Sequence, residues 1–168
     1  GEGRWHISGS SWDATDALVP STESFIRNIM LGQQYYRQEF GVESTDIFLP
    51  DCFGFGWTLP TIASHCGLIG FSSQKLDWRV HPFYGKSKHP FTIGLWKGID
   101  GSSIMLAHGY DYGRRWNDED LSENEQLKEL AGRTPLNTVY RYYGTGDIGG
   151  SPTLASVRSV EKGLRGNG

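Results

Sequence analysis

The sequence lacks several features that would narrow its function at once. No apolar run approaches the roughly 18 residues of a membrane-spanning helix, so no membrane span is predicted. The two cysteines, Cys52 and Cys66, are too few for a disulfide framework. With 16 basic and 19 acidic residues the net charge is −3, and the basic residues are scattered. We therefore expect no membrane partner and no nucleic-acid partner, while the compartment (cytoplasm or periplasm) and the possibility of an oligomer stay open.

Closely spaced histidine pairs are also missing. None of the five histidines is followed by another at a spacing such as His-x-x-x-His, and a zinc site needs at least three protein ligands. The sequence by itself therefore shows no complete zinc site. The histidines are His6, His65, His81, His89 and His108.

Aromatic residues and glycine, in contrast, are abundant. Six Trp, eight Tyr and eight Phe make up 13% of the chain, and 23 Gly accompany them. Aromatic rings, flexible loops and carboxylates together suit a carbohydrate site, because sugar rings offer apolar faces as well as hydroxyls. The same composition also suits a core that is rich in aromatic side chains. Composition alone leaves both interpretations open.

The first half of the chain predicts a β-loop-α-β unit. Asp46–Pro50 is a short apolar run of the kind found in buried parallel strands, and Ile69–Ser72 resembles the next strand. Between them, Leu59–Cys66 reads as a short helix with Pro60 in its first turn and Gly67 after its end. Such a unit indicates the α/β class.

Further elements are predicted from caps and turns. A helix should follow Pro20-Ser21, with Ser21 as N-cap, an apolar stripe and Gly41 at its end. A second should begin at Ser122, which forms a capping box with Glu125. The remaining expectations are a strand in Gly3–Trp12, a loop in Val80–Pro90, strands at Phe91–Trp96 and Ser103–Ala107 around an Asp100-Gly101 turn, and a helix that starts at Ser151-Pro152.

Two carboxylates stand out as candidates for chemistry. Asp51 directly follows the Asp46–Pro50 strand, at the edge where α/β proteins bind ligands. It could act as a nucleophile, a base or a metal ligand, or it could only cap the following turn. Asp147 lies in a Gly-rich loop that lacks the Lys-Ser or Lys-Thr pair of a phosphate-binding P-loop. Two such carboxylates are what a glycosidase needs.

An ordered set of motifs resembles glycoside hydrolase family 38, the α-mannosidases. Leu49-Pro50-Asp51-Cys52-Phe53-Gly54 is similar to the family's Leu-Pro-Asp-x-Phe-Gly strand end. It is followed by Leu59-Pro60 and then by Gln74-Lys75-Leu76-Asp77-Trp78. The likeness covers nearly the whole chain in the same order. The other matching segments are Gly3-Arg4-Trp5, Gly9–Trp12, Asp16, Pro20–Ser24, His89–Phe91, Trp96–Gly98, Asp100–Ser102 and Gly146–Thr153.

This resemblance implies a fold and a reaction. Residues 1–168 would be an incomplete parallel-sheet (β/α) catalytic domain whose two ends look truncated. The reaction would be retaining hydrolysis of a mannose-containing oligosaccharide, with Asp51 as nucleophile and zinc ligand and Asp147 as acid/base. Substrate contacts are expected from three further residues, namely Lys75 beside the nucleophile, Trp12 and Asp16.

Departures from the family pattern limit what the chain can do alone. The family's His-x-Asp zinc pair is absent before Trp5, and a later zinc-binding His would lie beyond Gly168, so the remaining zinc ligands are expected outside this segment. Ala14 stands where the family has Glu, and Ile148 where it often has Gly. We therefore expect the isolated segment to be inactive. The alternatives are a non-catalytic carbohydrate-binding segment and a glycosidase specific for another α-hexoside.

Overall fold

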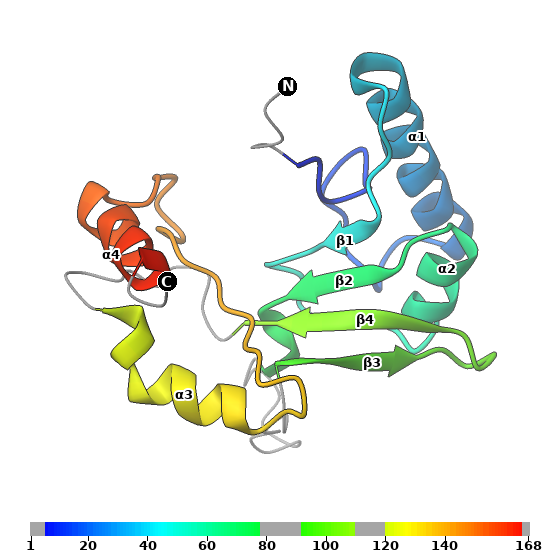
Figure 1. Cartoon of the computed structure of the whole chain (residues 1–168). Helices are drawn as coiled ribbons and strands as arrows, with labels where there is room; N and C mark the ends of the chain where they lie inside the picture. The colour runs from blue at the N-terminus through cyan, green and yellow to red at the C-terminus, as the bar shows by residue number, and fades with distance from the viewer. Residues whose placement is uncertain (1–5, 78–91, 110–119, 166–168) are drawn as a thin grey trace. The chain divides into compact units, whose positions relative to one another are not determined.

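The structure is a computed structural model that describes residues 6–77, 92–109 and 120–165 (Figure 1). The described residues form two compact units, the first made of residues 6–77 and 94–107 and the second of residues 92–93, 108–109 and 120–165. No described helix is long and apolar enough to cross a membrane.

In chain order the elements are α1 Thr22–Phe40, β1 Asp46–Phe48, α2 Leu59–His65, β2 Gly70–Ser73, the 3-10 helix η1 Lys75–Asp77, β3 Ile93–Lys97, β4 Ser103–His108, the 3-10 helix η2 Leu121–Glu123, α3 Glu125–Gly132 and α4 Leu154–Arg165.

A four-stranded sheet with the order β1-β2-β4-β3 is the centre of the first unit. Strands β1 and β2 are parallel, with Ile47 opposite Phe71. The arrows in Figure 1 show β4 running the same way, while β3 runs against it. The β3–β4 connection is a hairpin, and Gly101 takes the left-handed φ of 85° that its turn requires. This mostly parallel sheet confirms the predicted α/β class.

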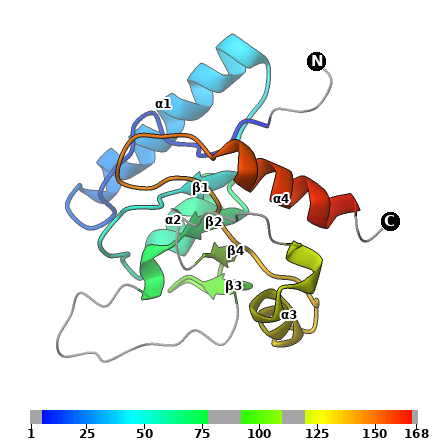
Figure 2. The ribbon, with the colours of Figure 1, turned by 90° about the vertical axis from the view of Figure 1, so that its left-hand side faces the viewer.

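Helices α1 and α2 lie on one face of this sheet (Figure 2). Apolar side chains from both helices meet those of the strands in one core, and burial of that apolar surface is the main favourable term in folding. Ile47 and Ala63 are completely buried there. The core consists of Phe25, Ile29, Ile47, Leu49, Leu59, Ala63, Leu68, Phe71 and Ile104.

Helix α1 begins and ends where the sequence predicts. The Ser21 hydroxyl accepts a hydrogen bond from the backbone N–H of Ser24 at 3.2 Å, and Gly41 ends the helix with a φ of 68°. Only part of the predicted apolar stripe is buried. Phe25 and Ile29 face the core, whereas Met30 is 60% exposed because it lies one residue further round the helix.

One predicted strand is missing, and most predicted boundaries shift by one to three residues. Residues 6–12 contain no strand, although the N–H of Ser10 donates to the carbonyl of Asp46 at 2.8 Å. Helix α3 begins at Glu125 and not at Ser122, because Asn124 is its N-cap and Asp120 caps the separate turn η2. Helix α4 begins at Leu154 and not at Pro152, and the hydroxyl of Thr153 accepts the N–H of Ser156. Strand β3 begins at Ile93, and Phe91 lies outside the described residues. The loop expected at 80–90 lies outside the described residues.

The second unit is built around α3, α4 and η2. Helix α4 approaches η2 so closely that a Cβ added to Gly163 would lie 3.0 Å from the Cβ of Leu121. Thr92 is buried, and its hydroxyl accepts the backbone N–H of Tyr140 at 3.1 Å. This unit carries the Gly-rich loop with Asp147.

Candidate active site

Asp51 and Lys75 come together at the carboxyl ends of two neighbouring parallel strands. Asp51 lies three residues after β1 and Lys75 two residues after β2. The parallel register sends both segments out at the same edge of the sheet. Lys75 Nζ lies 2.8 Å from Asp51 Oδ1, so the expected proximity of these two residues is confirmed.

The two partners of this ion pair differ in burial. The Lys75 side chain is only 7% exposed, whereas that of Asp51 is 53% exposed. Lys75 Nζ also lies 4.8 Å from the centre of the Phe53 ring, within range of a cation–π contact. The ammonium group is therefore buried between Asp51 and its other contacts, while the carboxylate it contacts remains open to a ligand.

A loop of residues 13–19 lies against the turn that follows Asp51. The thiol of Cys52 donates to the carbonyl oxygen of Thr15 at 2.9 Å. Burial raises the pKa of the Cys52 thiol, and the negative charges of Asp16 and Asp51 raise it further. The Leu18 side chain occupies the space where Gly54 would otherwise carry a Cβ. Two segments that are distant in sequence thus meet next to the candidate nucleophile.

Asp16 shapes its own loop. Its Oδ1 accepts the backbone N–H groups of Leu18 at 2.7 Å and Val19 at 2.9 Å, and these bonds lower the pKa of the Asp16 carboxyl. The arrangement is that of an Asp-stabilised turn. A role in substrate binding stays a prediction for Asp16.

Trp12 is fixed to α1 rather than to Asp51. Its backbone N–H donates to the carbonyl of Asn28 at 3.0 Å, and its ring meets that of Tyr35 edge to face at 5.4 Å. The side chain is 59% exposed, so its ring is available to a ligand. Its role in substrate binding also stays a prediction.

Asp147 lies in the second unit, in an exposed turn before α4. Its backbone has a left-handed φ of 62°, which is uncommon for a residue other than glycine but tolerated by Asp. The turn is closed by the hydroxyl of Thr145, which donates to the carbonyl of Ser151 at 3.1 Å. A role as acid/base stays a prediction for Asp147.

Metal-ligating side chains do not gather within the described ranges. Among residues 6–77, 92–109 and 120–165, no three His, Cys, Asp or Glu side chains are placed to hold a metal ion. His65 instead contacts Asp100, with Nε2 2.8 Å from Oδ2. His81 and His89 lie outside the described residues.

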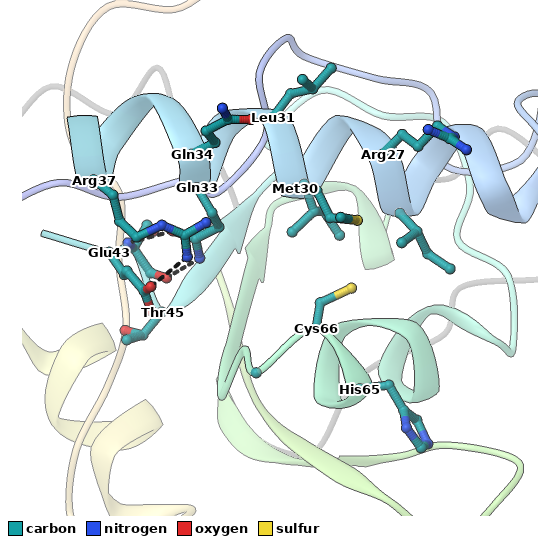
Figure 3. Close-up of a pocket in the computed structure, with 14 residues that line it drawn as sticks. Arg27, Met30, Leu31, Gln33, Gln34, Arg37, Glu43, Thr45, His65 and Cys66 are labelled. Carbon is teal, nitrogen blue, oxygen red and sulfur yellow. Dashed lines mark hydrogen bonds and ion pairs between the residues drawn. The ribbon is translucent and has the colours of Figure 1, made fainter. Parts of the chain in front are cut away.

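Figure 3 shows a pocket of about 580 Å³. It lies at the opposite end of the strands from Asp51, because residues 43–45 before β1 line it. It is lined by α1, by residues 43–45 before β1 and by the end of α2. Met30 and Cys66 contribute to its walls, and Arg37 forms an ion pair with Glu43 at 2.6 Å on its rim. None of the predicted site residues lines this pocket, so we assign the candidate active site to the edge with Asp51.

Comparison with known proteins decides the family of the chain. Residues 1–163 match the family described as glycosyl hydrolases family 38 N-terminal domain. The chain belongs to glycoside hydrolase family 38. The resemblance seen in the motifs is thereby confirmed.

Named relatives and a solved structure are similar over almost the whole chain. Alpha-mannosidase G of Dictyostelium discoideum is 34% identical over 160 residues, which are 94% of this chain and 14% of that protein. Alpha-mannosidase 2C1 of Mus musculus is 33% identical over 156 residues, 92% of this chain and 14% of that protein. The crystal structure of an alpha-mannosidase from Enterococcus faecalis V583 has a TM-score of 0.57 and 19% identity over 95% of this chain and 18% of that one, which shows the shared fold.

The family 38 chain thus spans about 14% of the length of the curated relatives it matches. It corresponds to a short part of proteins that are named as α-mannosidases. The activity of the complete protein is taken up below as a proposal.

Sequence reasoning missed the contacts around Cys52, Phe53 and Gly54. All three residues fall inside the recognised motif, but the motif points to Asp51 and assigns them no role. Their position next to Asp51 in the sequence was the one signal that could have marked them as part of the site. The partners of Cys52 and Gly54 are Thr15 and Leu18, which lie 37 and 36 residues away and could not be identified from spacing.

Proposed function

We propose that this chain is part of the catalytic domain of a retaining α-mannosidase in which Asp51 is the nucleophile. The observation that carries the proposal is the half-exposed Asp51 carboxylate at the carboxyl end of β1, paired at 2.8 Å with the buried Lys75. Family membership and relatives named as alpha-mannosidases support the substrate class. The substrate is a mannose-containing oligosaccharide.

The surroundings of Asp51 suit nucleophilic attack. A carboxylate that attacks a sugar must be accessible, and its oxygen must point at the anomeric carbon. Lys75 contacts Oδ1 and thereby orients the carboxylate, while the exposed part of Asp51 can face a substrate. Phe53, on the same turn and 59% exposed, offers an apolar surface next to it.

The proposed reaction has two steps. A carboxylate oxygen of Asp51 forms a bond to the anomeric carbon as the bond to the leaving oxygen breaks, and Asp147 donates a proton to that oxygen. A water molecule then attacks the same carbon, Asp147 takes its proton, and the Asp51 ester is released as carboxylate. The configuration at the anomeric carbon is retained after two inversions.

Zinc enters this proposal with Asp51 as one ligand and with the remaining ligands proposed to come from outside this segment. The described residues do not form a zinc site by themselves, because a zinc ion needs at least three protein ligands and no such group is present among them. Asp51 is proposed as one ligand. No step above passes through the metal.

The test is hydrolysis of an aryl α-mannoside by the full-length protein that contains this chain. Wild type should turn over the substrate, Asp51→Asn should lose turnover, and a zinc chelator should reduce turnover in wild type. Aryl α-glucoside and α-galactoside, assayed in parallel, distinguish a mannosidase from another α-hexosidase. Turnover that is unchanged in Asp51→Asn would show that Asp51 only shapes its turn, and sugar binding without any turnover would favour a carbohydrate-binding segment.

A further inference from the structure

The loop of residues 13–19 is fixed to α1 at its start. The backbone N–H of Asp13 donates to Asn28 Oδ1 at 3.0 Å, and Asn28 Nδ2 donates to the carbonyl of Asp13 at 2.9 Å. Both bonds come from one amide side chain on α1. The loop therefore leaves the helix in a defined direction.

The middle of the loop is stiffened from within. Asp16 Oδ1 accepts two successive backbone N–H groups, those of Leu18 and Val19. Such a turn removes two donors that would otherwise bond to water and limits the conformations of residues 16–19.

Contacts made by Cys52 and Leu18 hold the loop to the turn after Asp51. The Cys52 thiol donates to the carbonyl of Thr15 at 2.9 Å. Leu18 packs over Gly54, where any side chain would overlap with it, and also reaches Gly56, whose added Cβ would lie 3.7 Å away. Because Cys52 immediately follows Asp51, the first contact connects the loop to the residue beside the candidate nucleophile.

We propose that Cys52 is a positioning residue that holds the loop of residues 13–19 as a wall of the sugar site beside Asp51. This inference rests on the proposed function, since it assigns the loop to the site of the Asp51 reaction. The thiol has one hydrogen to donate, and the Thr15 carbonyl receives it. Loss of the bond frees the middle of the loop, while its start stays tied to Asn28.

Cys52→Ala and Cys52→Ser separate the hydrogen bond from the size of the side chain. Alanine removes the donor, whereas serine keeps an O–H in nearly the same place. In the full-length protein, Cys52→Ala should raise KM for an aryl α-mannoside roughly tenfold, because a displaced wall binds the sugar less well. Cys52→Ser should restore KM most of the way to the wild-type value. Hydrogen exchange at the Leu18 and Val19 amides should be faster in Cys52→Ala than in wild type or Cys52→Ser.

The KM measurement distinguishes positioning from simple loss of folded protein. A partly unfolded preparation has a lower apparent kcat and an unchanged KM. Cys66→Ala is the matched control, because Cys66 is also a half-buried free cysteine but lines the pocket at the other end of the strands (Figure 3). It should leave both KM and the exchange of residues 18 and 19 unchanged.

The outcomes also separate this inference from the proposed function. An unchanged KM in Cys52→Ala, or a KM equally raised in Cys52→Ser, would overturn the positioning role even if Asp51→Asn abolishes turnover. Exchange at Leu18 and Val19 that does not respond to Cys52→Ala would overturn it as well. Full turnover in Asp51→Asn would instead overturn the proposed function, and the exchange data would still report on the contact between Cys52 and the loop.

Discussion

At the scale of single residues, Asp147 combines a proposed acid/base role with an unusual backbone. Its left-handed φ of 62° would cost a residue such as alanine roughly 1 kcal/mol or more. Asn enters this conformation as readily as Asp does. Asp147→Asn therefore removes the proton donor without straining the turn, whereas Asp147→Ala would change both.

We predict that Asp147→Asn lowers kcat of the full-length protein by roughly 100-fold to 10,000-fold on an alkyl mannoside, whose leaving group needs a proton. The rate of the first step should fall less on an aryl mannoside with an acidic phenol, because this leaving group needs no proton. Azide needs no base to attack, so it should restore turnover of the glycosyl-enzyme intermediate. The melting temperature, measured beside kcat, should match wild type. Equal kcat in wild type and Asp147→Asn on both substrates would refute the acid/base role.

At the scale of secondary-structure elements, Gly32 shows how closely α1 approaches the segment before it. A Cβ at this position would overlap with the carbonyl oxygen of Ser10 and with the backbone of Ser11 and Trp12. Backbone cannot rotate aside as a side chain can. The absence of a side chain at Gly32 thus allows α1 to lie directly on residues 10–12.

We predict that Gly32→Ala destabilises the protein by about 1–3 kcal/mol, because the overlap outweighs the gain of roughly 1 kcal/mol that alanine brings to a helix. Gly132→Ala is the matched control. It is also a helical glycine, but a Cβ there meets nothing within 4 Å, so it should be neutral or stabilising. Urea denaturation of both variants measures the difference, and equal stability of the two would contradict the close packing.

Asp100 joins α2 to the β3–β4 hairpin. Hydrogen bonds from Ser102, His65 and Thr61 hold the pKa of its carboxyl well below the ordinary value of 3.8. A lowered pKa in the folded state means that the ionised form stabilises the fold. This contribution is complete above the unfolded pKa and is lost as the pH falls below 3.8 towards the folded pKa.

We therefore predict that Asp100→Asn is less stable than wild type at neutral pH and that the gap narrows below about pH 4. The amide cannot ionise, so this variant lacks the acid-dependent loss that Asp100 contributes. Midpoints of urea denaturation between pH 2.5 and 7 would show the trend, with Asp13→Asn as a control on an exposed carboxyl away from the hairpin. A gap between Asp100→Asn and wild type that stays constant with pH would argue against the role of the ionised carboxylate.

Capping residues in the sequence predicted the ends of some helices correctly and those of others wrongly. Ser21 and Gly41 predicted both ends of α1 correctly. Near α3 three polar residues compete, and Asn124 caps the helix although Ser122 and Glu125 match a capping box. At α4 the hydroxyl of Thr153 takes the capping role two residues later than Pro152 suggested.

The candidate site was predictable only in part. The strand pattern placed Asp51 at a carboxyl edge, and the motif added Lys75; the register of two parallel strands then explains why they meet. The contact of Cys52 with Thr15 depends on tertiary packing of a loop 37 residues away, which no local pattern encodes. Metal ligands leave no spacing signal when they come from distant parts of a longer polypeptide.

At the scale of the whole molecule, the chain covers a small part of the proteins that it resembles. It spans 14% of the length of its curated relatives, and its described residues hold no group of three metal-ligating side chains. Both faces of a parallel sheet are normally covered, yet Leu95 and Met105 on the sheet here are 64% and 43% exposed. We therefore propose that a complete site draws on polypeptide beyond this segment.

We predict that the isolated 168-residue chain shows no turnover of an aryl α-mannoside, whereas the full-length protein turns it over and loses this activity on treatment with a zinc chelator. The physical reason is that nucleophile, acid/base and metal ligands must be held in one geometry, and a missing group leaves the transition state unsupported. Readdition of zinc should restore the full-length protein but not the segment, which separates a lack of metal from a lack of ligands. Turnover by the isolated segment that disappears in Asp51→Asn would mean instead that these residues suffice for the reaction.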